Sequence, residues 1–477
     1  MLRFFLSLIL MCCVAVMAPV GSDAAVGSGY VSTISNRYVM DAGGTPKFLI
    51  GYYGWNSVDN ASLIDHPMSY QTILSTGDDY GINYLRVSLG VNRFTASTSP
   101  ASYDGTTTRT PFAYTGSPAK ADLDAWDSTF WNSLKALAAD ARSKNILLHV
   151  SIFDSVGFNV GTATYRWSNS FWNVANQKQS FYGNLDRDAN GGAHQAGEFY
   201  DLDAFNNGTG IGYYQKRLID KATSELNSYE NVFFEMGNEL SESGTSWHDT
   251  VLTYTRTKTS KLVTSNTCER YLCITPSSPG MYVRHVAESV SELKSGLESI
   301  VGSGYPVMED PDGIIYFKTG SLTVRRQAAW TSFVGGAAGW GGFTFEMDTG
   351  ANTDVLTMYK HLQDFISTTG IRFWEMTPQQ SHISPNATNS LLALSAVEYL
   401  GYAKVDASIT ITLASGHYTV RYYNPATGVF TTGAEVDGGA RTFNRPSGAS
   451  DWVVYLKSAT PGSPRNPGSP RSLSITM

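Results

Sequence analysis

Short apolar runs alternate with longer stretches of helical periodicity over the first three quarters of the chain. The apolar runs that predict strands are 48–52, 82–89, 146–153, 232–236, 271–275, 305–308 and 342–345. Between them, apolar residues recur every three to four positions in 121–143, 213–229 and 250–262, which predicts amphipathic helices. Near-continuous apolar strands followed by such helices are typical of a parallel barrel covered on its outside. We therefore expect an α/β fold with a (β/α)8 barrel.

Two segments depart from this simple alternation. Residues 38–41 and 47–50 flank a Gly-rich segment at 42–46, which predicts a hairpin leading into the first barrel strand. Between Pro276 and Glu288 there is little room for both a helix and a strand. Residues 282–285 are therefore expected to form a short sixth strand, with the fifth helix reduced or missing.

The pattern of apolar and polar residues changes after the barrel, which we expect to span residues 28–376. Short β-type runs follow at 409–413, 418–423 and 452–456, and they predict a small antiparallel β-sandwich over 381–458. For this sandwich, sugar binding and packing against the barrel are both open, and the lack of an aromatic row favours packing. Residues 459–477 are rich in Pro, Ser, Gly and Arg and are expected to be a disordered tail.

The first 25 residues have the layout of a secretory signal. Arg3 precedes an apolar run that ends in small residues, and the run is too short to favour a membrane span. We expect a secreted or periplasmic protein with no membrane segment in its mature form. Loss of the signal leaves two cysteines, Cys268 and Cys273, and both a disulfide bond and two ordinary thiols fit their spacing.

Charge and composition narrow the classes of partner. The formal net charge is -7 and no basic run occurs, which argues against nucleic acid because phosphate binding needs clustered Lys and Arg. Aromatic residues make up 12% of the chain and charged residues only 16%. That balance suits sugars, which stack on flat rings and hydrogen-bond through their hydroxyls. The sequence shows no metal cluster, phosphate loop or nucleotide fingerprint, so we expect a monomer without a cofactor or metal that binds polysaccharide or oligosaccharide.

The segment Phe234-Glu235-Met236-Gly237-Asn238-Glu239 carries the first candidate chemistry. It ends the fourth predicted strand, and the active sites of barrels lie at the carboxyl ends of their strands. Glu235 projects to the same side as Glu239 but deeper in the barrel. We interpret it as the ion-pair partner of a basic residue such as Arg86.

A second apolar strand also ends in carboxylates, at Glu309 and Asp310. Cleavage of a glycosidic bond needs two carboxyl groups, about 5 to 5.5 Å apart for retention and about 6.5 to 9.5 Å apart for inversion. The ends of strands four and seven can supply that pair. Glu309 is the candidate, with Asp310 and Asp312 as rivals, and a nearby Arg86 would stabilise the ionised partner.

These motifs together resemble the clan A glycoside hydrolases, close in style to family 5 endoglycanases and related barrels with a C-terminal sandwich. The likeness is carried by residues 81–86 of strand two, by the run ending at Glu239, by Glu309 and by Trp340 near strand eight. It covers the expected barrel.

The resemblance implies roles for individual residues. Glu239 would be the acid/base, Glu309 the nucleophile, and Asn238 a hydrogen-bond donor to the sugar 2-hydroxyl, with retention of configuration. Because the family commonly places a His or Tyr from strand six beside the nucleophile, Tyr282 and His285 are candidates.

Further residues at predicted strand ends and loops are candidates for sugar contacts. Trp55 and Trp247, like Trp167 and Trp172, fall in loops after strands one, three and four, where they could stack on sugars or anchor the loops. Asn56 and His149 could hydrogen-bond a sugar. For His149, a satisfied core histidine fits its place in strand three equally well.

The leading hypothesis is an exported retaining β-glycosidase that acts on a polysaccharide or oligosaccharide. The aromatic- and Asn-rich stretch 155–212 favours endo action, since it could line a cleft, although it could equally close an exo-type pocket. An exo-acting side-chain glycosidase is one alternative, and a non-catalytic carbohydrate-binding protein is another. The presence of Glu239, Glu309, Asn238 and Arg86 together disfavours the last. Fold-level likeness does not choose the glycan.

Overall fold

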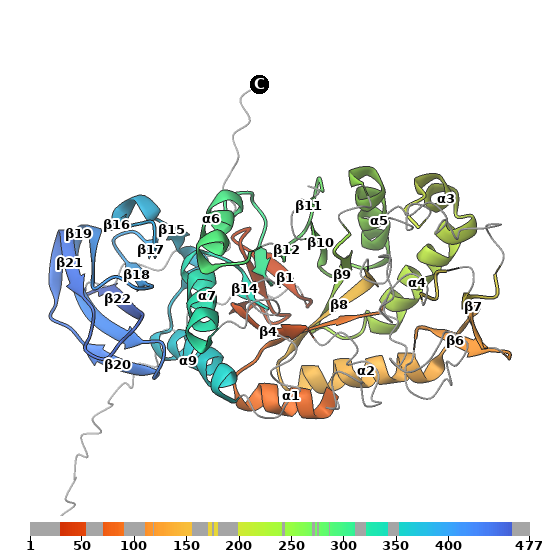
Figure 1. The fold of residues 1–477 in the computed structure, drawn as a ribbon, viewed down its shortest axis with the longest axis horizontal. Coiled ribbons are helices and arrows are strands. Elements are labelled where there is room, and N and C mark those ends of the chain that lie inside the picture. The colour runs from red at the N-terminus through yellow and green to blue at the C-terminus, as the bar shows by residue number, and fades with distance from the viewer. Residues whose placement is uncertain are drawn as a thin grey trace, which may run out of the picture.

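The computed structural model describes residues 29–53, 70–89, 110–117, 119–154, 170–173, 176–179, 199–240, 244–269, 272–273, 276–285, 287–310, 321–341 and 353–459. Within this part the chain forms a closed barrel followed by a separate antiparallel β domain (Figure 1). The predicted signal peptide, most of the predicted tail, Trp55, Asn56 and Trp167 lie outside the described residues.

The barrel consists of eight parallel strands: β4 (Leu49–Tyr53), β5 (Tyr84–Ser88), β8 (Leu147–Asp154), β9 (Val232–Asn238), β10 (Val263–Glu269), β12 (Tyr282–Arg284), β13 (Val307–Glu309) and β14 (Gly339–Trp340). Each strand pairs in parallel with the next, and β14 pairs with β4 to close the ring. The predicted (β/α)8 architecture is therefore confirmed.

Helices cover the outside of the barrel (Figure 1). They are α1 (Tyr70–Asp79), α2 (Ser128–Ser143), α3 (Leu202–Asn207), α4 (Gly210–Leu226), α5 (Thr245–Lys258), α6 (Val290–Ile300), α7 (Leu322–Val334) and α9 (Thr353–Thr369). The α2 helix shows why they form. Asp127 caps its start by accepting hydrogen bonds from the amides of Thr129 and Phe130, and its buried stripe includes Leu134 and Leu137.

Alternation along the strands separates an inner from an outer layer. Six inner side chains form one buried cluster with Val31 and Val39: Leu49, Tyr84, Leu147, Phe233, Val283 and Met308. Val31 and Val39 come from the segment that forms β1 (Ser32–Ile34), β2 (Tyr38–Met40) and β3 (Pro46–Lys47), a small sheet that closes the floor of the barrel. The hairpin predicted around 42–46 is confirmed as the β2–β3 pair.

Two steps towards the carboxyl ends of these strands, the inner positions become polar. They are Arg86, His149, Glu235, His285 and Asp310. This parity matters for the site, because a residue one position earlier or later on the same strand points to the outer layer instead.

Two predicted elements are wrong. The helix predicted from residue 121 begins at Ser128, because Lys120–Trp126 forms β7 and pairs with β6 (Phe112–Thr115). The fifth barrel strand is β10, whereas Leu272–Cys273 forms β11, which runs back antiparallel to it and sets Cys268 opposite Cys273 in the backbone register. In the described residues between β10 and β12 there is no helix, and β12 is the short sixth strand that was predicted. Residues 342–345 lie outside the described chain.

The C-terminal domain is an antiparallel sandwich built from β15 (Thr377–Pro378), β16 (Ile383–Ser384), β17 (Asn389–Leu394), β18 (Glu398–Ala403), β19 (Ser408–Asn424), β20 (Val429–Thr432), β21 (Val436–Asn444) and β22 (Trp452–Ser458). The long strand β19 pairs with β21 on both sides of an irregularity between Leu413 and His417, and from Tyr418 to Tyr423 it also pairs with β22. Its two halves thereby enclose an apolar core that includes Ile411, Val454 and Leu456.

The sandwich packs against α7 and α9, as Figure 1 shows in blue beside them. Trp330 of α7 stacks on Tyr402 with ring centroids 6.1 Å apart. Beside this contact, Arg326 of α7 forms hydrogen bonds of 2.6 and 3.1 Å to buried Asp451, which also accepts a bond from the Tyr402 hydroxyl. A buried, doubly bonded ion pair therefore joins the two domains.

Replacing Arg326 by methionine is expected to lower the free energy of unfolding by about 3 to 5 kcal/mol, because it leaves the buried Asp451 carboxylate without its charge partner. Urea denaturation measures the change. The exposed Arg445, replaced in the same way, is expected to change stability by less than about 0.5 kcal/mol. Equal stabilities of the two variants would show that the Arg326–Asp451 pair does not hold the domains together.

Because of His248 in α5, we expect the folded protein to lose stability in acid. This histidine is buried, with no hydrogen-bond partner within the described chain, and burial lowers its pKa to about 4. Because the pKa is about 6.5 in the unfolded chain, the stabilisation is complete above pH 6.5 and is lost as the pH falls towards 4. The wild type should therefore lose about 3 kcal/mol relative to a His248→Leu variant between pH 8 and pH 4. Parallel unfolding curves at the two pH values would contradict this.

Candidate active site

Glu239 stands directly after β9 in an unusual backbone conformation. Its φ is 52°, in the left-handed region that non-glycine residues rarely adopt. Two residues earlier, Gly237 is required by packing, since a Cβ atom there would lie 2.5 Å from Leu240 Cδ1 and 2.9 Å from the Phe153 carbonyl oxygen. Strained backbone at the carboxyl end of a barrel strand is a feature of functional sites.

Arg86 organises the layer below this mouth. Its guanidinium donates hydrogen bonds of 2.6 and 2.9 Å to Glu235 Oε2 and one of 2.8 Å to Asn238 Oδ1. The interpretation of Glu235 as an ion-pair partner inside the barrel is confirmed. Burial raises the pKa of Glu235, and the Arg86 cation opposes this effect.

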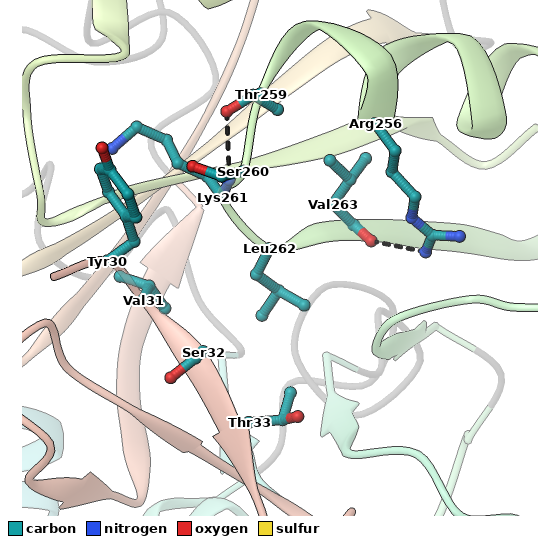
Figure 2. A pocket seen from close by; sticks show the side chains of 10 residues that line it. All are labelled: Tyr30, Val31, Ser32, Thr33, Arg256, Thr259, Ser260, Lys261, Leu262 and Val263. Carbon is teal, nitrogen blue, oxygen red and sulfur yellow. Dashed lines mark hydrogen bonds between the residues drawn. The ribbon is translucent and has the colours of Figure 1, made fainter. Parts of the chain in front are cut away.

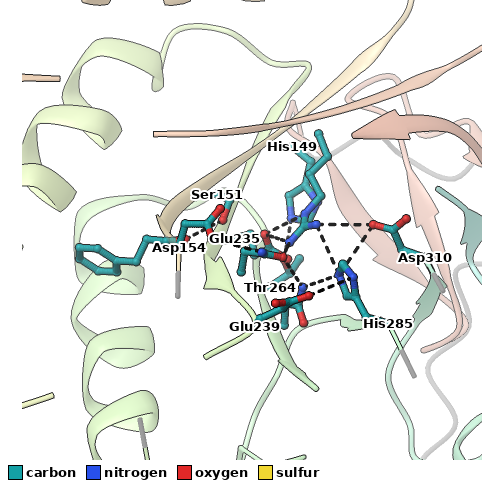
Figure 3. Close-up of polar contacts among 12 residues, drawn as sticks. His149, Ser151, Asp154, Glu235, Glu239, Thr264, His285 and Asp310 are labelled. Atoms are coloured by element: carbon teal, nitrogen blue, oxygen red, sulfur yellow. Dashed lines mark hydrogen bonds and ion pairs between the residues drawn. The ribbon is translucent and has the colours of Figure 1, made fainter. Parts of the chain in front are cut away.

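His285 lies between two carboxylates at the mouth (Figure 3). Its Nδ1 is 3.7 Å from Glu239 Oε1, and its Nε2 is 3.8 Å from Asp310 Oδ2. Asp310 is also 3.5 Å from Arg86 Nη1. Glu239 and Asp310 therefore face opposite nitrogens of one imidazole ring, with a fixed cation beside Asp310.

Glu309 points away from the barrel interior, contrary to the prediction that it faces Glu239. Its carboxylate accepts a hydrogen bond of 2.7 Å from Arg284, its register partner on β12. The guanidinium of Arg284 lies against α6, where a Cβ atom on Gly296 would be 2.2 Å from Nη2. Because Met308 belongs to the inner cluster, Glu309 points outward and Asp310 inward. Burial raises the pKa of Glu309, and the charge of Arg284 acts against this.

Two further predicted site residues share the outward parity of Glu309. Tyr282 packs with Leu297 of α6 and Val307 in an outer cluster. Trp340 is the register partner of Glu309, and its indole donates a hydrogen bond of 2.9 Å to Tyr359 of α9. Neither side chain lies beside Glu239, so their prediction as sugar contacts is corrected. His285, the other candidate from strand six, does reach the mouth.

His149 is a satisfied core histidine and not a sugar contact at the mouth. Its Nδ1 lies 2.8 Å from the Tyr84 hydroxyl and its Nε2 lies 2.7 Å from Thr264 Oγ1. The ring stacks on Phe233 at 4.2 Å. Burial lowers its pKa well below the ordinary value, so the ring is neutral and both nitrogens are occupied within the barrel.

The tryptophans described beside the barrel mouth are buried anchors. Trp247 of α5 and Trp172 both pack on Phe153 and Phe199, with ring centroids 5.3 to 6.2 Å apart. Trp247 is 2% exposed. Trp172 and Trp247 therefore anchor their loops, and they do not offer an exposed ring on which a sugar could stack.

The sequence reasoning missed Asn266, which is fully buried in β10. Its Nδ2 lies 3.0 Å from Asn238 Oδ1 and 2.7 Å from His285 Nε2, so it connects the ends of strands four and six. Polar inner positions give β10 no apolar run, which is why this strand was not predicted. The alternation of Thr264 and Asn266 within 263–269 was the available signal.

A cavity of about 540 Å³ lies at the other end of the barrel, between the start of β10 and residues 30–33 (Figure 2). Burial lowers the pKa of Lys261, one of its lining residues, to about 8. Among the described residues, no carboxylate lines this cavity, so it does not offer the pair of carboxyl groups that glycoside cleavage uses. The paired carboxylates at the carboxyl ends of the strands are the better candidate site.

Within the described residues, His, Cys, Asp and Glu side chains form no group of three that could hold a metal ion. No helix among them combines the length and apolar character needed to cross a membrane.

Comparison with solved structures supports the fold. A glycoside hydrolase family 5 structure from Bacteroides vulgatus matches with a TM-score of 0.60 at 13% identity, covering 90% of this chain and 93% of that one. A second structure, described as a glycoside hydrolase, matches with a TM-score of 0.60 at 13% identity and coverages of 91% and 98%. The chain has the fold of these glycoside hydrolases. Another Bacteroides vulgatus structure reaches a TM-score of 0.65 at 12% identity, with coverages of 91% and 83%. Family models and curated proteins give no match.

Proposed function

We propose that this protein is an exported glycoside hydrolase that cleaves β-linked polysaccharide or oligosaccharide with retention of configuration. The observation that carries the proposal of glycoside cleavage is the placement of Glu239 and Asp310 beside His285 at the carboxyl ends of the barrel strands. Retention is proposed from the resemblance to the clan A enzymes and not from the spacing of these two carboxyl groups. Glycoside cleavage requires two carboxyl groups that flank the bond to be cleaved. The shared fold agrees with this chemistry but does not choose it.

In the proposed mechanism, Glu239 acts as the acid/base and Asp310 as the nucleophile. Glu239 donates its proton to the glycosidic oxygen while an Asp310 oxygen attacks the anomeric carbon, giving a glycosyl-enzyme ester and a free alcohol. Glu239 then removes a proton from water, which attacks the same carbon and releases Asp310. The Arg86 cation, 3.5 Å from Asp310, supports the ionised nucleophile. Asp310 thereby takes the role that the resemblance assigned to Glu309.

The substrate is proposed to be neutral. The mouth already contains Glu235, Glu239 and Asp310 with Arg86 as the near cation, so a further negative charge on the sugar would be repelled. We propose cleavage at internal linkages, on the strength of the aromatic composition of 155–212, and export, on the strength of the first 25 residues.

A panel of neutral polysaccharides and chromogenic β-glycosides tests this proposal. The expected result is release of reducing ends from at least one β-linked glycan, with oligosaccharides appearing before monosaccharide. Release of monosaccharide alone would remove the endo assignment. Binding of a glycan without hydrolysis of any would favour the carbohydrate-binding alternative.

A further inference from the structure

Asn266 lies where it can determine which nitrogen of His285 carries a proton. We propose that Asn266 is a positioning residue that holds His285 as the neutral tautomer with its proton on Nδ1, directed at Glu239. The catalytic meaning of this arrangement rests on the proposed function, whereas the position of the proton does not.

The argument begins at Arg86, whose guanidinium can only donate hydrogen bonds. Its Nη2 is 2.8 Å from Asn238 Oδ1, so that atom is an acceptor and the orientation of the Asn238 amide is fixed. The other end of the same amide agrees with this, since Asn238 Nδ2 donates to Asp154 Oδ1 at 3.3 Å.

The orientation of Asn266 follows from that of Asn238. Its nearest side-chain atom lies 3.0 Å from Asn238 Oδ1, and two acceptor oxygens at this distance would repel each other. This atom must therefore be the amide nitrogen, Nδ2, which only donates. The same nitrogen is 2.7 Å from His285 Nε2.

His285 Nε2 consequently faces two obligatory donors, Asn266 Nδ2 at 2.7 Å and Arg86 Nη1 at 3.5 Å. A nitrogen in this environment must present its lone pair. Asp310 Oδ2, which would favour a proton on Nε2, lies at 3.8 Å, beyond hydrogen-bond distance. The ring proton is therefore on Nδ1.

This placement points the N–H dipole of the ring towards Glu239. Nδ1 lies 3.7 Å from Oε1, beyond hydrogen-bond distance, so its effect on the Glu239 carboxyl group is electrostatic. Charged groups among the described residues that act on the ring include Glu239, Asp310 and Arg86 at 3.5 to 3.8 Å, and Glu235 and Glu309 through electrostatic interaction. By donating to Nε2, Asn266 favours the neutral ring among these groups.

The test is ¹⁵N NMR of the histidine side chains in the full-length protein, with an Asn266→Asp variant. The chain has 8 histidines, and a His285→Gln variant assigns the signal. In the wild type we expect a protonated Nδ1 and an unprotonated Nε2. In Asn266→Asp, the new carboxylate can only accept, so Nε2 should also gain a proton at neutral pH.

Asn231→Asp is the matched control. Asn231 is a buried asparagine at the opposite end of β9, where its amide donates to the carbonyls of Ala138 and Ile146. The same chemical change there should leave the His285 signals as in the wild type.

The proposal is overturned if wild-type His285 carries its proton on Nε2, or if folded Asn266→Asp leaves both nitrogens unchanged. The wild-type spectrum alone decides the matter if Asn266→Asp does not fold. Kinetics form a separate arm, in which Asn266→Asp should lower kcat about 10- to 100-fold and move its pH profile with little change in KM. Absence of any glycosidase activity in the wild type would defeat the proposed function and leave the NMR result standing.

Discussion

Replacing Glu239 by glutamine is expected to lower kcat about 10²- to 10⁴-fold on the best glycan of the panel, because glutamine cannot donate a proton to the glycosidic oxygen. Glutamine has nearly the same shape, so the left-handed backbone at this position and the affinity for the glycan should be kept. Initial rates measure turnover, and calorimetric titration with the same glycan measures binding.

Glu225→Gln provides the comparison. Glu225 lies on α4 and pairs with Lys221 and Lys135 on the surface of the helical layer, so its replacement should leave turnover unchanged. If Glu239→Gln retained wild-type turnover, the residue would have no part in the mechanism. Loss of both turnover and glycan binding would instead assign Glu239 to substrate binding.

Replacing Asp310 by asparagine is expected to lower kcat by at least about 10³-fold, because the amide cannot form the glycosyl ester. Glu309→Gln is the informative neighbour. Its side chain faces Arg284 between the barrel and α6, so kcat should fall far less, while the free energy of unfolding drops by about 3 kcal/mol through the uncompensated Arg284.

The two variants are compared for turnover per folded molecule, with folding checked by circular dichroism and urea unfolding. The reverse pattern, an inactive but stable Glu309→Gln beside an active Asp310→Asn, would return the nucleophile to Glu309. It would also show that the parity of β13 differs from the one described.

The strands of the first half of the barrel were predictable because each contains a long apolar run. The outer faces of β8 and β9 each carry an unbroken row of apolar residues, which in β8 is Leu148, Val150 and Ile152. These apolar runs are more continuous than an amphipathic helix of the same length requires. The prediction missed β10 for the opposite reason. Its inner residues Thr264 and Asn266 are polar and belong to the polar layer inside the barrel, so the strand has no apolar run. Residues 271–275 were predicted as the fifth barrel strand instead. An apolar run indicates a strand but does not indicate its direction or its pairing partner.

The site was predictable where it depends on a local motif and not where it depends on strand parity. Glu239, Asn238 and Arg86 lie together as expected, because one strand end and one facing strand determine them. On β12, β13 and β14, each two or three residues long, the sequence cannot say which of two neighbours points inward. A shift of one position moves every side chain to the other face, and Tyr282, Glu309 and Trp340 all fell on the outer one.

The central claim is that Glu239 and Asp310, beside His285 at the barrel mouth, act on one sugar. Its most direct test is trapping with a panel of activated 2-deoxy-2-fluoro-β-glycosides, followed by peptide mass spectrometry of the labelled enzyme. The account predicts one sugar per chain, attached to Asp310, and labelling of Asp310 that persists when Glu309 is glutamine. A label on Glu309, or hydrolysis with inversion and no label, would contradict it.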